Sequence, residues 1–359
     1  MRKSIRGSVE VEKPAITVGI DVGDRFSRYC VINGDGEVIE EGRIQTNGAA
    51  LERHFAGEPR QRIAMECGTH SPWVSRLLQG MGHEVLVANA RKVRAITGSE
   101  SKNDRNDAEK LARFAAYDVR LLSPIQHRSP ERQRDLNLLQ ARDTLVRART
   151  MLVNAMRGLV KSAGQRLPKC STESFARAVR TTIPAGMEPA LTPLLEQVAS
   201  LTEQIRKMDK QIEALGKQYP EVVRLRSVPG VGPVVAAAYV LTLDSPGAAG
   251  KSRAVGAFLG LRPRQSQSGE YDPQLRISKT GNSYLRRLLV QAAQYVLGRF
   301  GPDSELRRWG LKLAASGAKR GKKRAVIAVA RKLAVLLHHL WRSGEYYRPF
   351  PNATQVSTP

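Results

Sequence analysis

The chain has 359 residues, of which 58 are Lys or Arg and 33 are Asp or Glu, so its formal net charge is +25 and its pI is about 10.5. This balance favours a polyanionic partner, above all nucleic acid. The N-terminus lacks an apolar signal core, no apolar run reaches membrane-spanning length, and Cys30, Cys67 and Cys170 are too far apart for a zinc finger or a disulfide framework. We therefore expect a cytoplasmic protein with no membrane partner.

The positive charge is concentrated in the rear of the chain. Residues 1–120 hold 19 basic and 17 acidic side chains, a difference of +2, whereas residues 121–359 hold 39 and 16, a difference of +23. The length allows more than one domain, each with its own core. The pattern predicts acidic chemistry in front and a nucleic-acid-binding surface behind.

Residues 14–125 are expected to form an α/β domain. The run AITVGIDVG is typical of a buried strand, and residues 33–36 (NGDG) form a turn signal between two extended segments, which predicts three antiparallel strands. After a short helix at about 49–56, the strand RIAMECG, a helix at 71–80 and the strand EVLVAN imply crossovers and parallel pairing. This order of elements is that of a ribonuclease-H-like fold.

Residues 126–220 are expected to form a coiled-coil helical hairpin. Prolines separate two heptad seams, which either bury each other in one antiparallel hairpin or bury partner helices in a dimer. Heptads alone leave both arrangements open. The first seam is Leu138, Ala141, Leu145, Ala148, Leu152, Ala155 and Leu159, and the second is Leu194, Val198, Leu201, Ile205, Met208, Ile212 and Leu215.

Residues 221–348 are expected to form a small, mostly helical domain, followed by a disordered tail at 349–359. In the string VPGVGP, Gly230 and Gly232 are typical of a helix-hairpin-helix motif, whose backbone amides approach a phosphate without reading bases. A Gly-Pro turn before a buried Ala-rich helix is the structural alternative. A last amphipathic helix at about 322–341 follows a basic cluster, in which we expect Lys322 and Lys323 to contact phosphate.

Four carboxylates in the front part predict a metal site. Asp21 ends the first strand, Glu66 lies near the end of RIAMECG, and Asp104 and Asp107 are three apart at a helix start, so they share one face. Singly, each is explained by helix capping or a turn. Together they suit two Mg²⁺ ions, which prefer oxygen ligands and stabilise phosphodiester displacement. The segment GIDVGD also resembles the phosphate loop of actin-like sugar kinases, but no glycine-rich adenosine segment follows it.

A cluster of basic residues surrounds two serines behind the helix-hairpin-helix string. Such a setting would hold a phosphate beside the hydroxyl of Ser268 or Ser266, although a serine in a loop is usually a turn former. The basic residues are Arg262, Arg264, Arg276, Lys279, Arg286 and Arg287.

These motifs together resemble the DEDD-type bacterial insertion-sequence recombinases, family one-hundred-and-ten. The similar segments are GIDVGD, AMECGTH and KNDRNDAEKLA in front, and VPGVGP, FLGLRPRQSQSGE and RISKTGNSYLRRLL behind. The resemblance implies a RuvC-like front domain, a coiled-coil hairpin and a rear transposase domain. It also implies that Asp21, Glu66, Asp104 and Asp107 are the metal ligands and that Ser268, with Ser266 as the alternative, attacks a DNA phosphate to form a covalent phosphoserine.

The resemblance further implies three partners and a location. They are target and donor DNA, a noncoding RNA that is encoded by the element and guides the choice of DNA, and other copies of the chain in a dimer to tetramer with a composite active site. The location would be the nucleoid of a bacterial cytoplasm. A structure-specific nuclease or Holliday-junction resolvase without serine chemistry is the alternative, and a non-enzymatic nucleic-acid-binding protein is the third possibility.

Overall fold

The computed structural model describes residues 15–90, 104–248, 250–269, 271, 273, 275–315 and 320–350, and the side chains of 104 and 105 are outside this description. The chain divides into two compact units, Met1–Arg128 and Ser129–Pro359. Most of the tail predicted to be disordered lies outside the described residues. Within the described part of the chain, no helix is both long and apolar enough to cross a bilayer.

The first unit is built on a five-stranded sheet with the order β3-β2-β1-β4-β5. The strands are β1 (Ile16–Asp21), β2 (Phe26–Asn33), β3 (Val38–Gln45), β4 (Arg62–Glu66) and β5 (Glu84–Ala88). The antiparallel pairing of β1 to β3 and the parallel pairing of β1, β4 and β5 confirm the predicted topology.

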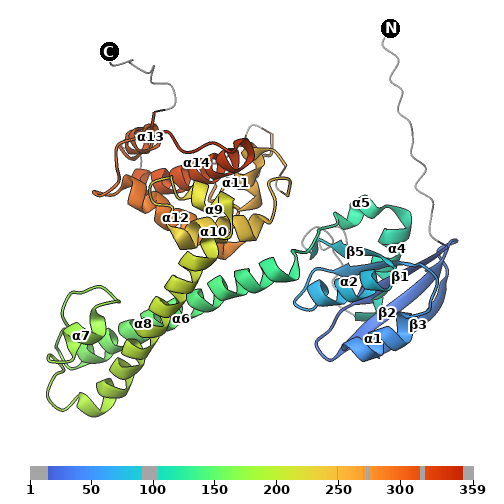
Figure 1. Cartoon of the computed structure of the whole chain (residues 1–359), viewed down its shortest axis with the longest axis horizontal. Helices are drawn as coiled ribbons and strands as arrows, with labels where there is room; N and C mark the ends of the chain where they lie inside the picture. The colour runs from blue at the N-terminus through green and yellow to red at the C-terminus, as the bar shows by residue number, and fades with distance from the viewer. Residues whose placement is uncertain are drawn as a thin grey trace, which may run out of the picture. The chain divides into compact units, whose positions relative to one another are not determined.

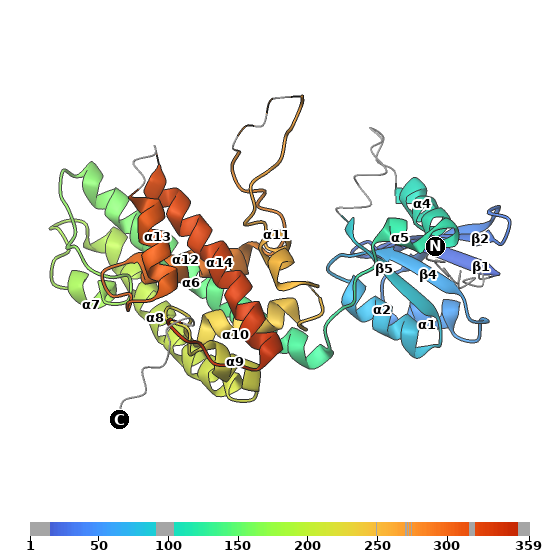
Figure 2. The ribbon, with the colours of Figure 1, turned by 90° about the horizontal axis from the view of Figure 1, so that it is seen from above.

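Helices cover both faces of this sheet (Figure 1). On one face, α1 (Gly48–Phe55) and α2 (Ser71–Gly80) bury Leu51, Phe55, Val74 and Leu78 against Val18 and Ile20. On the other face lie α4 (Asp104–Tyr117) and α5 (Val119–Leu122), as Figure 2 shows from above. Because β1 is covered on both sides, its side chains are apolar or small at every central position, which explains the uninterrupted run TVGI.

Gly19, in the middle of β1, permits a very close approach of α4. A Cβ atom at this position would lie 1.9 Å from the carbonyl oxygen of Ala108 and 2.6 Å from the backbone nitrogen of Ala112. Both are backbone atoms of a packed helix, so they cannot move aside as a flexible side chain could. The missing side chain of Gly19 therefore sets the distance between the helix and the strand that ends in Asp21.

The second unit begins with a long antiparallel helical hairpin. It consists of α6 (Pro130–Ser162) and α8 (Glu188–Gly216), with the short helix α7 (Phe175–Val179) between them. The second predicted seam is confirmed, because every one of its residues is buried or half-buried. The first predicted seam is confirmed only in part. Leu138, Leu145, Ala148 and Leu152 are half-buried, but Ala141, Ala155 and Leu159 are exposed, and the buried stripe, which contains Leu139, Val153, Met156 and Val160, lies one residue farther along.

Polar pairs between the two helices explain this one-residue shift. In the buried stripe, Arg142 donates to Asp209 on α8 (2.6 Å), and Arg149 donates to the hydroxyl of Thr202 (3.3 Å). A prediction that uses only apolar residues leaves these two arginines out of the interface. It therefore favours the neighbouring stripe of α6, in which leucine and alanine recur without interruption.

The remaining helices form a core that includes the base of the hairpin. They are α9 (Pro220–Leu225), α10 (Pro233–Leu243), η1 (Ser252–Ala254), α11 (Val255–Phe258), α12 (Ser283–Leu297), α13 (Glu305–Ala314) and α14 (Gly321–Ser343). Leu136 and Leu139 of α6 and Ile212 of α8 belong to the same apolar cluster as α10, α12 and α14. The hairpin is thus fixed to the C-terminal helices at its base. The helix α14 confirms the helix predicted at about 322–341.

The variant Gly19→Ala tests the contact between α4 and β1. We expect it to destabilise this contact by about 3 kcal/mol, because the added methyl group forces the helix backbone away from the strand. Hydrogen exchange of the β1 and α4 amides measures the loss. Gly48→Ala is the matched control, since no atom lies within 4 Å of the added Cβ. Equal protection of α4 in both variants would contradict the expectation.

Candidate functional site

Two of the predicted carboxylates lie at one end of the sheet. Asp21 is the last residue of β1, and Glu66 is the last residue of β4. The two strands are parallel neighbours, with Gly19 opposite Ala64 and Ile20 opposite Met65, so the next residues in register are Asp21 and Glu66. We call this end of the two strands the carboxylate edge. Both side chains are half-buried there.

The orientation of α4 brings its beginning to the same edge. Near its C-terminal end, the carbonyl of Ala115 accepts a hydrogen bond from Arg62, the first residue of β4 (3.2 Å). In its second turn, Ala108 lies over Gly19 in the middle of β1. The helix therefore runs antiparallel to β1 and β4, and its first turn points toward the carboxylate edge.

Asp104 and Asp107 both belong to this first turn of α4, as predicted. Asp107 is about 39% exposed and lies 3.7 Å from Lys110. The side chain of Asp104 lies outside the described residues. Among the described side chains, no group of three or more His, Cys, Asp and Glu residues is close enough together to hold a metal ion. The structure thus brings Asp21 and Glu66 to one edge and directs α4 toward it, but the described carboxylates do not form a complete ligand set.

The chemistry of these side chains fits a hard divalent cation. Asp21, Glu66 and Asp107 offer only carboxylate oxygens, which Mg²⁺ prefers, and a magnesium site commonly uses one or two carboxylates with water in the remaining positions. Asp21, Glu66 and Asp107 are hard oxygen donors, so this set does not favour a soft metal.

The loop that follows Glu66 is fixed by a small hydrogen-bond network. The hydroxyl of Ser71 donates its one proton to the carbonyl of Gly68 (2.9 Å). Its oxygen must therefore accept the hydrogen bond that joins it to Nε2 of His127 (2.9 Å), so that the imidazole donates. Burial lowers the pKa of His127, and the charges of Arg76 and Arg128 lower it further, which favours this neutral imidazole. The network holds the backbone directly after Glu66 in one conformation.

His70 presents a defined hydrogen-bond donor near the carboxylate edge, and the sequence analysis did not single it out. The indole N–H of Trp73 donates to Nδ1 of His70 (3.0 Å), so the proton of a neutral imidazole resides on Nε2, which lies 3.2 Å from Asp24. The signal in the sequence was a His and a Trp three residues apart at a helix start. This donor is suited to a phosphate oxygen as well as to Asp24.

The segment between α11 and α12 forms an extended arm, described at residues 261–269, 271, 273 and 275–278, which we call the serine arm (Figure 2). Backbone hydrogen bonds from Ser278 to Arg262 (2.9 Å) and from Arg264 to Arg276 (3.0 Å) join its two sides. At its base, Gly260 and Gly281 both have positive φ angles, and a Cβ on either would lie about 2 Å from a carbonyl oxygen of the other side. Only glycine allows the two sides to approach this closely.

Ser268 occupies a turn of the serine arm. Its backbone N–H donates to the carbonyl of Tyr271 (3.2 Å), and its carbonyl accepts from the N–H of Tyr271 (3.0 Å), while Gly269 has a φ of +56°. The side chains of Ser268 and Ser266 are both exposed. The turn holds the Ser268 hydroxyl at the surface, where a phosphate can reach it.

The predicted basic residues divide into two groups. Arg262, Arg264 and Arg276 are exposed on the serine arm, where Arg262 donates to the side-chain oxygen of Gln265 (2.8 Å), and Lys279 is exposed at the base of the arm. Arg286 instead donates to the carbonyls of Leu259 and Thr280 (both 3.0 Å), so it fixes the base of the serine arm.

Arg287 is also used within the fold. It donates to Asp143 on α6 at 2.5 Å, and its guanidinium lies 5.6 Å from the ring centre of Tyr284. This ion pair links α12 to the hairpin. Of the predicted phosphate-binding residues, Arg286 and Arg287 therefore have structural partners, which leaves the arginines of the serine arm as the stronger candidates.

The helix-hairpin-helix string joins α9 to α10, as expected from the sequence. Gly230 has a φ of +83°, and Gly232 is the extended residue directly before α10. Both line an open groove of about 520 Å³, together with Arg226 and Tyr295. Residues Ala236 to Leu243 of the helix that follows are buried, so the glycine turn also has a structural role, which is to begin a helix of the core.

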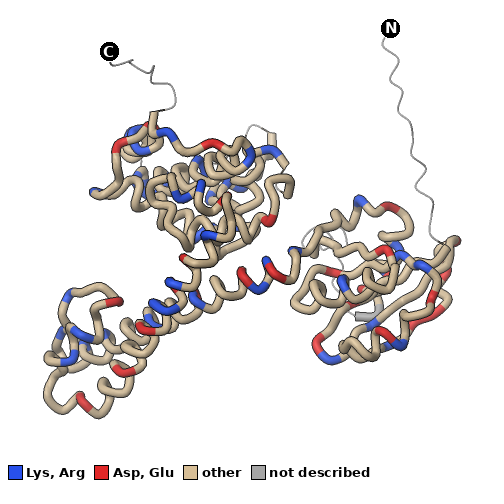
Figure 3. Tube along the Cα trace, in the orientation of Figure 1, with Lys and Arg blue, Asp and Glu red and all other residues tan. Residues whose placement is uncertain are grey.

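Lys322 and Lys323 lie exposed in the first turn of α14. Among the described residues, neither lysine forms an ion pair with a carboxylate, so both charges are available to a ligand. Basic positions follow the hairpin and the C-terminal helices along much of their length (Figure 3). This distribution of basic residues agrees with the prediction that residues 121–359 attract polyanions.

Known protein families match both parts of the chain. The DEDD transposase family of insertion sequence IS110 matches residues 18–164, and the family described as transposase IS116/IS110/IS902 matches residues 222–307. A probable family 20 transposase of Pseudomonas aeruginosa is 30% identical over 341 residues, which cover 92% of this chain and 98% of the relative. The chain belongs to this family of insertion-sequence transposases.

Other relatives extend over similar lengths. The transposase for insertion sequence element IS1111A of Coxiella burnetii is 29% identical and covers 92% of this chain and 91% of its own. The transposase for element IS1328 of Yersinia enterocolitica is 28% identical and covers 80% and 85%. The protein is thus an enzyme that acts on DNA, and its DEDD domain indicates dependence on a divalent metal ion.

Proposed function

We propose that this transposase is a DNA recombinase that cuts and rejoins strands through a metal-binding carboxylate edge and the serine of its basic arm. The observation that carries the proposal is the antiparallel placement of α4 on β1 and β4, which directs its first turn toward Asp21 and Glu66. The strand order with helices on both faces supports a ribonuclease-H-like, RuvC-like first domain. The hairpin and the C-terminal helices would then form the coiled-coil and transposase domains.

Asp21, Glu66, Asp104 and Asp107 would hold the metal, which we propose to be Mg²⁺, in two sites. When bound, such ions neutralise charge on a phosphate and lower the pKa of a coordinated hydroxyl. The protein's own contribution is to hold the carboxylates on rigid elements: β1 and β4 fix two of them, and the contact through Gly19 fixes the helix that carries the others.

Ser268 would act as the nucleophile. Its Oγ forms a bond to phosphorus as the bond from phosphorus to one bridging deoxyribose oxygen breaks, the Oγ proton is lost, and the released oxygen takes up a proton. The phosphodiester energy is conserved in the phosphoserine, so a hydroxyl of another strand can reverse the step and join the DNA. Arg262, Arg264 and Arg276 would bind the phosphate oxygens on both sides of the serine.

We propose a noncoding guide RNA, encoded by the element, as the partner that selects target and donor DNA. The resemblance of the six motifs to family one-hundred-and-ten supports this partner. Two features suit contacts to nucleic-acid backbones: the exposed Lys322 and Lys323, and the glycine turn at Gly230 and Gly232. Such contacts position a duplex without reading its bases. Base pairing with an RNA would then supply the sequence choice.

We also propose that the hairpin assembles copies of the chain into dimers or tetramers. Three residues of the first predicted seam, Ala141, Ala155 and Leu159, are exposed along α6. These positions repeat with the spacing of a helix interface, and exposed apolar residues in such a row favour contact with another protein surface. Within the described residues, no helix covers this row. The α6 helix of a second copy carries the same row and could pack against it.

Asp21→Asn tests the carboxylate edge. We expect metal-dependent DNA cleavage to fall by at least about 10³-fold, because one charged ligand is lost while the shape of the side chain is kept. Binding of DNA and RNA should remain, since Asp21 lies outside the basic surfaces. Asp35→Asn, an exposed turn residue with the same change of charge, is the control. Undiminished cleavage by Asp21→Asn would remove the argument for a metal site here.

Ser268→Ala tests the covalent step. We expect this variant to lose both the protein–DNA adduct and strand joining, because the methyl side chain has no hydroxyl to attack phosphorus. Denaturing gels and mass spectrometry of the trapped peptide measure the adduct. Ser266→Ala, two residues away and equally exposed, should retain it. Full recombination by both variants would reject serine chemistry and favour a structure-specific nuclease or Holliday-junction resolvase.

The double variant Ala155→Glu/Leu159→Glu tests assembly through α6. We expect self-association to weaken at least about tenfold, because an interface would have to bury two charges. Sedimentation velocity over a concentration series measures it. Gln204→Glu/Gln211→Glu on the exposed face of α8 adds the same charge and serves as the control. Equal association of the two variants would place the assembly interface elsewhere.

A further inference from the structure

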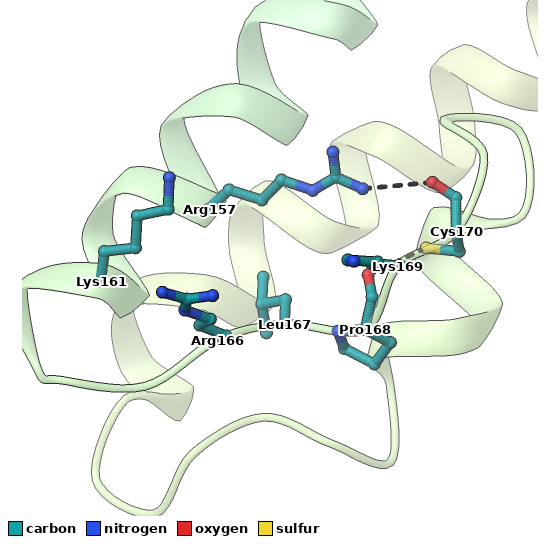
Figure 4. A pocket seen from close by; sticks show the side chains of 7 residues that line it. All are labelled: Arg157, Lys161, Arg166, Leu167, Pro168, Lys169 and Cys170. Carbon is teal, nitrogen blue, oxygen red and sulfur yellow. Dashed lines mark hydrogen bonds between the residues drawn. The ribbon is translucent and has the colours of Figure 1, made fainter.

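A basic pocket lies at the far end of the helical hairpin, where α6 passes into the loop before α7. Its volume is about 470 Å³. Figure 4 shows that Arg157 and Lys161 come from the last turns of α6 and that Arg166 and Lys169 come from the loop. Four of the seven lining residues are therefore cations, and the others are Leu167, Pro168 and Cys170. Pockets for neutral small molecules are lined mainly by apolar side chains.

The loop that carries two of these cations is held in place. Arg157 donates to the carbonyl of Cys170 (3.1 Å), and its guanidinium lies 5.4 Å from the ring centre of Phe175. Leu167 and Cys170 pack against the apolar cluster of Val153, Met156 and Phe175. Arg166 and Lys169 thus project from an anchored backbone, so less conformational entropy is lost when they bind a ligand.

The local charge is strongly positive and largely uncompensated. Residues 157–187 contain six basic residues and one acidic residue, a difference of +5. That one acid, Glu173, already accepts a hydrogen bond from Arg206 on α8 (3.4 Å). In the described part of the chain, no ion pair engages the four cations of the pocket, and none of its lining residues is acidic.

A structural role accounts for only part of this arrangement. Lys161 lies in the last turn of α6, where a cation stabilises the helix dipole, and Arg157 clamps the loop. Arg166 and Lys169 have neither role. Like charges gathered around one pocket repel one another, and a bound anion would relieve this repulsion.

We propose that this pocket binds the phosphate backbone of nucleic acid. The family acts on DNA, so nucleic acid is the polyanion present in every working complex, and a phosphodiester group accepts the hydrogen bonds that arginine and lysine donate. The contact adds affinity and fixes the position of the backbone along the hairpin without selecting bases.

This site is separate from the helices at the base of the hairpin. From Leu139, which belongs to the C-terminal core, to Lys161, the continuous helix α6 rises about 33 Å. Arg166 and Lys169 also lie between the two stretches that the transposase families match, residues 18–164 and 222–307. The pocket therefore forms a second, distant point of contact for a long nucleic acid.

The triple variant Lys161→Gln/Arg166→Gln/Lys169→Gln tests the proposal in the full-length protein. All three side chains are exposed, so the fold should be retained. The matched control Lys207→Gln/Lys210→Gln/Lys217→Gln removes the same charge from exposed positions of α8 and the residue that follows it. Binding of a 30-base-pair DNA duplex and of an RNA hairpin is measured by fluorescence anisotropy over a series of salt concentrations without divalent metal ions.

We expect the slope of log affinity against log salt to fall by about two to three in the triple variant and by less than about one in the control, since each phosphate contact contributes about 0.7 to 0.9. A loss with duplex DNA alone identifies DNA as the ligand, and a loss with the hairpin alone identifies RNA. Equal slopes for the two variants with both probes would overturn the proposal. Because no cleavage is measured, the result is independent of the metal and serine chemistry.

Discussion

The contact of α4 with β1 across Gly19 is the constraint on which the candidate site depends. A side chain at this position would meet the helix backbone at 1.9 Å, so the helix lies against the strand only because residue 19 has none. Asp21 is two residues farther along the same strand, and Asp107 directly precedes Ala108, the residue in contact. The depth of this packing therefore controls how closely carboxylates from a strand and a helix approach one another.

Much of the first unit could be predicted from the sequence, because its signals are local. The turn at residues 33–36, the strand pattern around Asp21 and the alternation of strands and helices after it each depend on neighbouring residues. The position of Glu66 at the end of β4 follows from the same pattern. By contrast, the pairing of Trp73 with His70 and of His70 with Asp24 depends on how the loop after Glu66 folds. No spacing in the sequence determines that geometry.

The hairpin shows a different limit of sequence-based prediction. Apolar periodicity located both helices, but on α6 it placed the seam one residue away from the buried stripe, because Arg142 and Arg149 belong to that stripe. Their partners, Asp209 and Thr202, are more than 50 residues away in sequence. In the same way, charge alone could not separate Arg286, which holds the base of the serine arm, from Arg276, which is exposed on it. Such distinctions require the tertiary partners.

The unbroken course of α6 has a consequence for how the protein can vary. A helix of 33 residues without a joint acts as a spacer of fixed length, about 50 Å. Deleting one residue shortens it by only 1.5 Å but turns everything beyond the deletion by about 100°. Its polar pairs with α8 would then lose register. Natural changes in its reach should therefore occur as whole heptads, inserted or removed in α6 and α8 together.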